Sequence, residues 1–482
     1  MKRTKLILLL IVFWGTYLRF INITSPLTDW HSWRQTFTAM ISRNFFENGY
    51  RILEPQIDYA GRSPGYVPLE FPLYQFIVSL FYKFFGVKEW LGKFISIIFS
   101  IGTMFFLFFL TKIYYNEKTA LYATSVFAFL PLSIFYSQTF MPESLLIFCS
   151  AGSIYFLSKW IEDSKTINFL ISLLLTTTAF LVKLTSIYLL FPLLYLFWFK
   201  YSKESIKKYE FWIFIIFAIL PSFLWYIIWI PKLSFERTFG SIWDTKDRWG
   251  NLNWWLNIEW YQKIFLQHIS ENWLLFIGLV FFILGFSQKI KDKKEYVFHI
   301  WTFGIILYFF VVAQGNWMHE YYQFPIVLPA SIFIGKSLNN IFEGENKKIK
   351  LAIILILLLL IPVGRYKLLR RFKRNDSYYY AGLTINKITP ADSLILVSDY
   401  DKPEVLYYSH RKGWHITPDV QNKEIVESYI NQGAEYFVTT CMKEFYSNKD
   451  FYEYIRKNYR LIKEDKSNFI IFRLTREKSN AR

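Results

Sequence analysis

The chain has 482 residues, of which 53% are hydrophobic and 21% aromatic, and its formal net charge is +18. Apolar runs of roughly 15–22 residues recur along it, and a run of about 20 is what a membrane-spanning helix needs. This composition excludes an ordinary soluble enzyme, and it indicates that the positive charge lies at a membrane surface and does not serve a nucleic-acid partner.

The N-terminus begins with the basic segment "MKRTK" and continues as an apolar run to Phe20. No small-residue cleavage site follows the run, so we interpret it as a retained first helix and not as a signal peptide. The fold class predicted is a polytopic α-helical membrane protein. We predict eleven spans, at residues 5–21, 91–113, 119–138, 143–160, 167–182, 184–199, 211–230, 273–288, 296–314, 322–340 and 350–364.

A further apolar block at 71–86 is the difficult case, because about 16 residues are few for a crossing. If this block lies along the membrane interface, the lysine-rich segments at 200–208, 289–294 and 347–350 share the cytoplasmic side with the N-terminus. That is the distribution required by the positive-inside rule. We therefore predict an interfacial helix at 71–86.

Two observations argue for the opposite topology. Lys83, Lys88 and Lys93 lie near the interfacial block, and a basic cluster at 365–374 follows the last predicted span. On the preferred topology, residues 22–90 form one large external loop that includes the interfacial helix. The transmembrane domain would then cover residues 1–364.

Two other regions lie off the membrane. Residues 231–272 contain five tryptophans, a composition typical of the headgroup interface, and form a second external loop. Residues 375–482 lose the long apolar runs. They alternate strand and helix patterns such as "SLILVSD", "NKEIVESYI" and "NFIIFRL", which predicts a small extracytoplasmic α/β domain of about 100 residues, large enough for its own core.

Ionisable residues gather at the predicted external ends of the spans, where a charge in apolar surroundings is a functional candidate. Helix caps and snorkelling side chains explain any one of them equally well, but chance would scatter the set over both faces. The two cysteines suggest no disulfide framework, and we find no glycine-rich phosphate loop. The candidates are Asp29, His31, Arg34, Glu70, Glu143, Lys183, His268, His319 and Glu320.

Several motifs together resemble the GT-C type membrane glycosyltransferases, a family that includes protein O-mannosyltransferases and the lipid A aminoarabinose transferase. A basic N-terminus, one helix and a loop opening on "DWHSWRQ" match its plan, as do "LEFPLYQFIVSLFYKFFGVKEWLGK", "FLPLSIFYSQTFMPESLLIF" and "AFLVKLTSIYLLFPLL". The resemblance covers residues 5–200 well, and residues 200–340 as a hydropathy pattern plus "HEYYQFP". One departure is Trp30, where family members often have a second acid.

The resemblance implies transfer of a sugar from a polyprenyl-phosphate donor, usually with inversion, to an extracytoplasmic lipid, glycan or protein acceptor at the plasma membrane. Asp29 would be the general base, and Glu143 would orient the acceptor or a metal. The donor phosphate would meet Arg34, Arg62 and Lys183, because cations stabilise the departing charge. Loop 22–71 contains four arginines and no lysine, which fits bidentate phosphate binding.

The same resemblance implies further contacts. His31, His319, Glu320 and Tyr321 would line the substrate site, and no nucleotide cofactor is expected. Glu70 matches a position that binds a divalent ion in some relatives, with His268 as a partner, and these ligand types suit zinc or manganese.

Three other classes of protein remain as alternatives. A transporter or flippase should show internal repeats and charges at mid-depth, neither of which we find. A lipid-linked polysaccharide polymerase or ligase usually centres on arginines in a late loop, whereas the acidic motif here comes early. A receptor with an external α/β head would not explain Asp29, Glu143 and Lys183 at one face.

Overall fold

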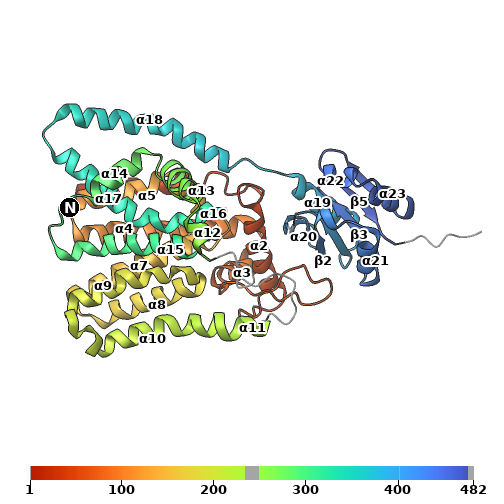
Figure 1. Cartoon of the computed structure of the whole chain (residues 1–482), viewed down its shortest axis with the longest axis horizontal. Helices are drawn as coiled ribbons and strands as arrows, with labels where there is room; N and C mark the ends of the chain where they lie inside the picture. Colours follow the sequence, from red (N-terminus) through yellow and green to blue (C-terminus); the bar gives the residue numbers. More distant parts are fainter. Residues whose placement is uncertain (1, 234–248, 401, 476–482) are drawn as a thin grey trace, which may run out of the picture.

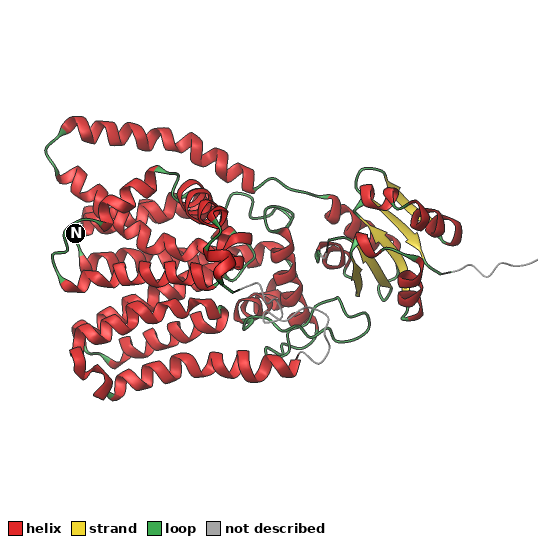
Figure 2. Cartoon of the chain, viewed as in Figure 1, coloured by secondary structure: helices red, strands yellow, loops and turns green. Residues whose placement is uncertain are grey.

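The structure is a computed structural model that describes residues 2–233, 249–400 and 402–475. Long apolar helices lie side by side in one bundle, and a small sheet flanked by helices lies beyond one end of it (Figures 1 and 2). Residues 234–248, which belong to the predicted tryptophan-rich loop, lie outside the described residues.

The bundle is built from helices whose apolar side chains pack against each other or face outward. Backbone groups in a bilayer must be satisfied within the segment, so a long apolar run can fold there only as a helix. The bundle elements are α1 (Lys2–Arg19), α4 (Glu89–Tyr114), α5 (Glu117–Phe129), α6 (Pro131–Tyr136), α7 (Glu143–Asp163), α8 (Thr166–Val182), η1 (Leu184–Leu189), α9 (Leu190–Tyr201), η2 (Ser202–Lys207), α10 (Tyr209–Phe223), η3 (Leu224–Trp229), α11 (Ile230–Leu233), α14 (Ile277–Phe286), η6 (Lys293–Glu295), α15 (Tyr296–Val311), α17 (Val327–Glu343) and α18 (Lys347–Arg371).

Each predicted span coincides with helix in the structure. Among the described residues, six helices are long and apolar enough to cross a membrane, and a seventh span arises if Ile258–Trp273 and Ile277–Phe286, bent by 104°, count as one. These helices indicate that the chain is an integral membrane protein. The total of eleven spans stays a prediction, because several shorter helices do not reach this length by themselves.

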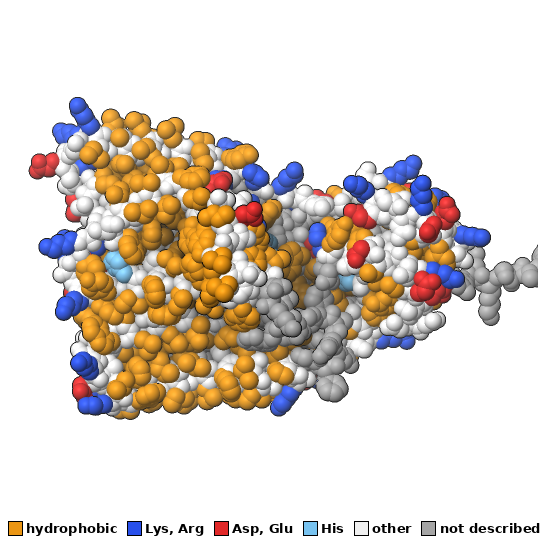
Figure 3. Space-filling view, in the orientation of Figure 1, with side chains coloured by type: hydrophobic (Ala, Val, Ile, Leu, Met, Phe, Trp, Pro, Cys, Tyr) orange, Lys and Arg blue, Asp and Glu red, His pale blue; other side chains and the backbone are white. Residues whose placement is uncertain are grey.

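Charged side chains mark the ends of the bundle, and hydrophobic side chains cover its flank (Figure 3). Lysines of the segments 200–208, 289–294 and 347–350 are mostly exposed at the end where the N-terminus lies. Tyr195 in α9 donates to the Lys293 carbonyl at 2.5 Å, which holds the segment 289–294 against the helix that leads into the segment 200–208. The lysine-rich segments thus share one end with the N-terminus, as the predicted topology requires.

The opposite end carries the first loop and several short helices. The predicted interfacial helix is α3, whose 13 residues are few for a crossing and whose Phe84 and Phe85 are exposed. A helix that we did not predict, α2, precedes it in the same loop. The elements at this end are α2 (Ser32–Glu47), α3 (Leu73–Phe85), α12 (Leu252–Trp255), α13 (Ile258–Tyr261), η5 (Gln262–Trp273), α16 (Ala313–Met318) and η7 (Glu320–Ile326).

The C-terminal region contains a five-stranded sheet in the order β2-β1-β3-β5-β4. β1 pairs in parallel with β2 and β3, and β5 pairs antiparallel with β3 and β4. The predicted strands are present, but β2, α19, α22 and α23 were not predicted. The elements are α19 (Ser377–Ile388), β1 (Leu394–Ser398), α20 (Glu404–Ser409), β2 (Gly413–Ile416), η8 (Pro418–Val420), α21 (Lys423–Asn431), β3 (Ala434–Thr439), α22 (Met442–Ser447), α23 (Lys449–Asn458), β4 (Arg460–Asp465) and β5 (Phe469–Arg473).

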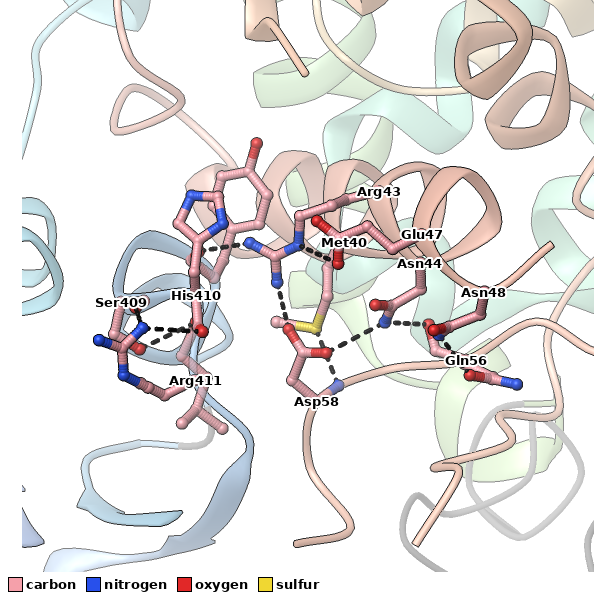
Figure 4. Close-up of polar contacts among 12 residues, drawn as sticks. Met40, Arg43, Asn44, Glu47, Asn48, Gln56, Asp58, Ser409, His410 and Arg411 are labelled. Atoms are coloured by element: carbon pink, nitrogen blue, oxygen red, sulfur yellow. Dashed lines mark hydrogen bonds and ion pairs between the residues drawn. The ribbon is translucent and has the colours of Figure 1, made fainter. Parts of the chain in front are cut away.

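A buried polar network fastens the C-terminal region to α2 (Figure 4). The Arg43 guanidinium pairs with the Asp58 carboxylate and donates to the Tyr407 carbonyl at 2.7 Å. Asn44 donates to the second Asp58 oxygen at 3.1 Å. The backbone of Gly413 also donates to the Asp58 carbonyl at 2.9 Å. Burying these groups requires that they be paired, so the network fixes how the two regions meet.

Candidate active site

Asp29 lies in the loop between α1 and α2, where it is almost completely buried. Its carboxylate accepts a hydrogen bond from the Gln35 amide at 2.5 Å, and the Gln35 oxygen accepts from the Phe140 N–H at 3.1 Å. Burial raises the pKa of Asp29 to about 6, although Lys93 and the Gln35 hydrogen bond oppose the shift. A carboxylate with a pKa near neutrality is suited to taking a proton.

Glu143 is the first residue of α7, and only 1% of it is exposed. One of its oxygens accepts from the Lys183 ammonium at 3.0 Å. Lys183 directly follows α8, and its ammonium lies over the rings of Tyr321, at 4.9 Å, and Tyr322, at 4.3 Å. The four side chains line one narrow space, so the predicted acid, lysine and tyrosine, each from a different part of the chain, do meet.

Three rings join the first loop to the segment before α17. The His31 ring lies 5.0 Å from Tyr321 and 5.7 Å from His319, and His319 stacks on Tyr321 at 5.3 Å. His31 has a left-handed backbone with φ of 60°, an uncommon conformation for a residue other than glycine. Burial, followed by the effects of His319 and Arg371, lowers the pKa of His31, so its ring is neutral at pH 7.

Glu320 holds the end of α18. Its carboxylate accepts from the Tyr136 hydroxyl at 2.9 Å and from the Arg371 guanidinium at 2.6 Å. The Arg371 guanidinium also lies 4.6 Å from the Trp30 ring, and the Arg371 carbonyl accepts from the Trp30 N–H at 3.1 Å. Glu320, predicted to line the substrate site, borders a cavity, and its charged partner there is Arg371, which is not among the predicted site residues.

That cavity has a volume of about 320 Å³ and a strongly basic wall. It lies next to the Asp29 loop, because the two residues after Asp29 border it. The sequence does not reveal it: Lys367, Arg370 and Arg371 belong to the basic cluster 365–374, but Lys263 and His268 lie far away in the chain and only the fold brings them to that cluster. The lining residues used below are Trp30, His31, Lys263, His268, Lys367, Arg370 and Arg371.

Arg34 and Arg62 occupy very different surroundings. Arg34, in the first turn of α2, pairs with the Glu70 carboxylate at the start of the segment before α3. This ion pair joins the start of α2 to the segment before α3, and it neutralises part of the charge of Arg34. Arg62 is exposed in the same loop, and among the described residues no ion pair of Arg62 is found. The structure therefore brings Arg34 toward Glu70 but does not bring Arg62 into this group.

The residues predicted to hold a divalent ion do not fit a shared metal. The Glu70 carboxylate is already neutralised by its ion pair with the Arg34 guanidinium. His268 borders the basic cavity, beside Lys263 and Arg371. Within residues 2–233, 249–400 and 402–475, no group of three or more His, Cys, Asp or Glu side chains could hold a metal ion.

Lys93, which argued against the predicted topology, has a local role. It is buried near the start of α4, where its ammonium donates to the carbonyls of Asn22 at 3.2 Å and Ser25 at 2.8 Å. These bonds hold the loop that leads to Asp29. The position of Lys93 therefore follows from its hydrogen bonds and says little about which side of the membrane it faces.

The C-terminal region covers the start of α2. The Ser32 hydroxyl, in the first turn of α2, donates to the buried Glu404 carboxylate at 2.7 Å. The Tyr408 hydroxyl accepts from the Leu27 N–H at 2.8 Å, and Thr28 donates to Asp376 at 2.6 Å. The chain segment around Asp29 is thus held between the bundle and the C-terminal region.

Glu404→Gln should raise the thermal stability of the full chain at pH 8 and leave it nearly unchanged at pH 4.5. Burial raises the pKa of Glu404 from 4.5 to about 7, so folding favours the protonated form and stability is lost as pH rises between these values. One pKa unit corresponds to about 1.4 kcal/mol, which gives a gain of about 3 kcal/mol for the neutral amide. Equal melting temperatures for the two proteins at pH 8 would contradict the role of burial.

Comparison with known proteins identifies the fold. The family model described as dolichyl-phosphate-mannose-protein mannosyltransferase matches residues 67–229, less than half of the chain. An uncharacterized protein of Aquifex aeolicus (strain VF5) is 27% identical over 302 residues, which is 61% of this chain and 65% of that protein. The match therefore spans less than two thirds of that relative.

Solved structures match nearly the whole chain. ArnT from Cupriavidus metallidurans bound to undecaprenyl phosphate gives a TM-score of 0.68 at 11% identity, covering 97% of this chain and 98% of ArnT. The apo oligosaccharyltransferase of Archaeoglobus fulgidus gives 0.64 at 12% identity, covering 95% and 73%. That protein has also been solved with Zn and sulfate, and with an inhibitory peptide and a dolichol-phosphate. These matches confirm the resemblance to the GT-C type fold.

Proposed function

We propose that this chain is a membrane glycosyltransferase that moves a sugar from a polyprenyl-phosphate donor to an acceptor hydroxyl outside the cytoplasm, with inversion, at the plasma membrane. The observation that carries the proposal is the buried Asp29, whose pKa is raised to about 6 and whose neighbours Trp30 and His31 lie against Arg371 and Tyr321. The family match and the ligands of the similar structures support a lipid-phosphate donor.

Asp29 acts as the general base in this scheme. Its free oxygen accepts the proton of the acceptor hydroxyl while the Gln35 amide holds the other oxygen in place. The acceptor oxygen forms a bond to the anomeric carbon, and the bond from that carbon to the donor phosphate breaks. Because Trp30 stands where relatives often have a second acid, one carboxylate performs the proton transfer, which suits a single displacement with inversion.

Lys183 stabilises the phosphate that leaves. Its ammonium has one carboxylate partner, Glu143, and lies over two tyrosine rings, so it keeps hydrogens for an incoming anion. Positive charge aimed at the developing phosphate charge lowers the barrier in a site shielded from water. Arg34 supports the same field from the neighbouring loop, with Glu70 holding its position.

The acceptor is a lipid, a glycan or a protein. The residues that line the two spaces come from loops and helix ends. These lie at the end of the bundle that bears the C-terminal region, opposite the N-terminus (Figure 1). The positive-inside rule places that end outside the cytoplasm. A transporter is less well supported, because these charges gather at one end of the bundle and not at mid-depth.

The test is transfer of radiolabelled sugar from polyprenyl-phosphate donors, by the full chain in proteoliposomes supplied with envelope extract, between pH 4.5 and 8. We expect the rate of label transfer, at donor concentrations below KM, to rise about tenfold per pH unit up to about pH 6 and then level off, since Asp29 must be ionised to accept a proton. A flat profile over this range would argue against Asp29 as the base, and no transfer from any donor would contradict the proposed activity.

A further inference from the structure

Two separate spaces border the candidate active site. The narrow one contains Glu143 and Lys183, which the proposed mechanism uses for the donor phosphate. The wider one, the basic cavity of about 320 Å³, is not used by that mechanism. Trp30 and His31 border it, so whatever binds there lies beside the Asp29 loop. A two-substrate reaction needs a second place for a substrate, and the basic cavity borders the loop that carries the base.

The wall of the basic cavity carries four cations against two carboxylates. Arg371 gives one nitrogen to Glu320, while its Nε is buried with no hydrogen-bond partner among the described residues. Lys367 pairs with Glu271 at 2.8 Å, but 43% of the Glu271 side chain is exposed. The Lys263 ammonium lies 4.3 Å from the Trp317 ring, and the described part of the chain gives it no acidic partner. The wall of the basic cavity therefore keeps a positive charge that its own carboxylates do not neutralise.

A buried histidine points to a ligand in the same place. His268, on η5, is 6% exposed and borders the cavity. Its Nδ1 has no hydrogen-bond partner within the described ranges. An unpartnered buried nitrogen is costly unless a ligand or water satisfies it. Cationic groups and ring nitrogens together suit an oxyanion such as phosphate, which accepts several hydrogen bonds.

The position of the cavity indicates how such a ligand arrives. Lys367, Arg370 and Arg371 come from the last turns of α18, whose apolar stretch is only 6% buried in the chain and so faces hydrocarbon. The cavity therefore lies where a lipid-facing helix reaches the membrane surface. The anion that fits best is the head group of an amphiphile, with its apolar part in the bilayer beside α18.

We infer that the basic cavity binds an anionic head group, of the phosphate class, carried by the acceptor, and that this contact sets the acceptor hydroxyl beside Asp29. The inference rests on the proposed function, because only a transferase has an acceptor substrate. It assigns the phosphate of the donor to Lys183 and that of the acceptor to Lys263, Lys367 and Arg371. The chain is thus specific for acidic acceptors, and neutral ones bind weakly.

The cavity lining separates this assignment from a donor site. A polyprenyl chain needs a long apolar path, whereas most of the residues around the cavity are charged or polar, and its apolar ones are few. The narrow space around Lys183 is lined largely by aromatic and aliphatic side chains, among them Tyr188, Tyr308 and Phe324. The narrow space around Lys183 thus offers the apolar surface that an isoprenoid phosphate requires, and the basic cavity does not.

The test is chemical acetylation of lysines in the full chain in nanodiscs, with the rate at each lysine measured by mass spectrometry. We expect pyrophosphate to slow acetylation of Lys263 and Lys367 at least fivefold and to leave Lys373 unchanged. Lys373 is the matched control, because it is exposed near the end of α18 but does not line the cavity. Undecaprenyl phosphate should protect Lys183 and neither cavity lysine.

Two results would overturn the inference. If pyrophosphate protects neither Lys263 nor Lys367, the cavity is not an anion site. If undecaprenyl phosphate protects both, the cavity belongs to the donor. As a second measurement, the Lys263→Gln, Lys367→Gln double variant should lower pyrophosphate affinity at least tenfold, and Lys373→Gln should not. Because neither assay needs turnover, a lack of sugar transfer with protection intact would sink only the proposed function.

Discussion

Asp29→Asn should lower sugar transfer by two or more orders of magnitude while donor binding changes little. The amide keeps the shape of the side chain and can still accept from Gln35, which donates at 2.5 Å, but it cannot take a proton. General-base catalysis contributes about 10²- to 10⁴-fold, which sets the expected loss. The measurement is single-turnover transfer from a labelled polyprenyl-phosphate sugar, together with binding of unlabelled donor.

The stability of the Asp29→Asn variant checks that any loss of transfer does not come from unfolding. Because burial raises the pKa of Asp29 to about 6, the charged form is disfavoured in the folded chain, and Asp29→Asn should not lower the melting temperature at pH 7.5. Asp376→Asn is the matched control, since that carboxylate accepts from Thr28 in the same loop. Near-normal transfer by Asp29→Asn, with Glu143→Gln inactive, would mean that the two acids exchange roles.

Lys183→Met should both destabilise the chain and weaken donor binding at least tenfold. Glu143 is 1% exposed and would lose its cationic partner at 3.0 Å, and breaking a buried ion pair in this way costs about 3 kcal/mol. Loss of a charge-assisted hydrogen bond to phosphate is worth about 1.5–3 kcal/mol, or about one to two orders of magnitude in affinity. Donor binding and thermal unfolding are measured on the same preparation.

A double variant separates the two effects. In Glu143→Gln, Lys183→Met no buried charge is left alone, so most of the stability should return while donor binding stays weak. Lys200→Met serves as control, because Lys200 also lies over an aromatic ring, Trp160 at 4.2 Å, but belongs to the opposite end of the bundle. Recovery of donor binding together with stability would show that Lys183 is only a structural partner of Glu143.

The helical character of the bundle and most strands of the C-terminal sheet can be read from local sequence patterns. An apolar run in a bilayer has one way to satisfy its backbone, so its helix can be read without knowing its neighbours. The helix α2 could not be predicted, because its sequence has no periodic apolar pattern. Its residues from Gln35 to Phe45 are all buried, polar ones included, because α3, the bundle and the C-terminal region pack around it. No amphipathic pattern results.

The pairing of side chains was decided only by the tertiary structure. Asp29, Glu143 and Lys183 were recognisable as candidates because charges are rare beside apolar runs. Other contacts depend on how segments far apart in sequence fold together. Examples are the pair of Arg34 with Glu70 and the contacts of Arg371 with Glu320 and Trp30. Local patterns report what a residue prefers, whereas an ion pair or a cavity depends on which distant side chains share the space, and that is set by the packing of the whole chain.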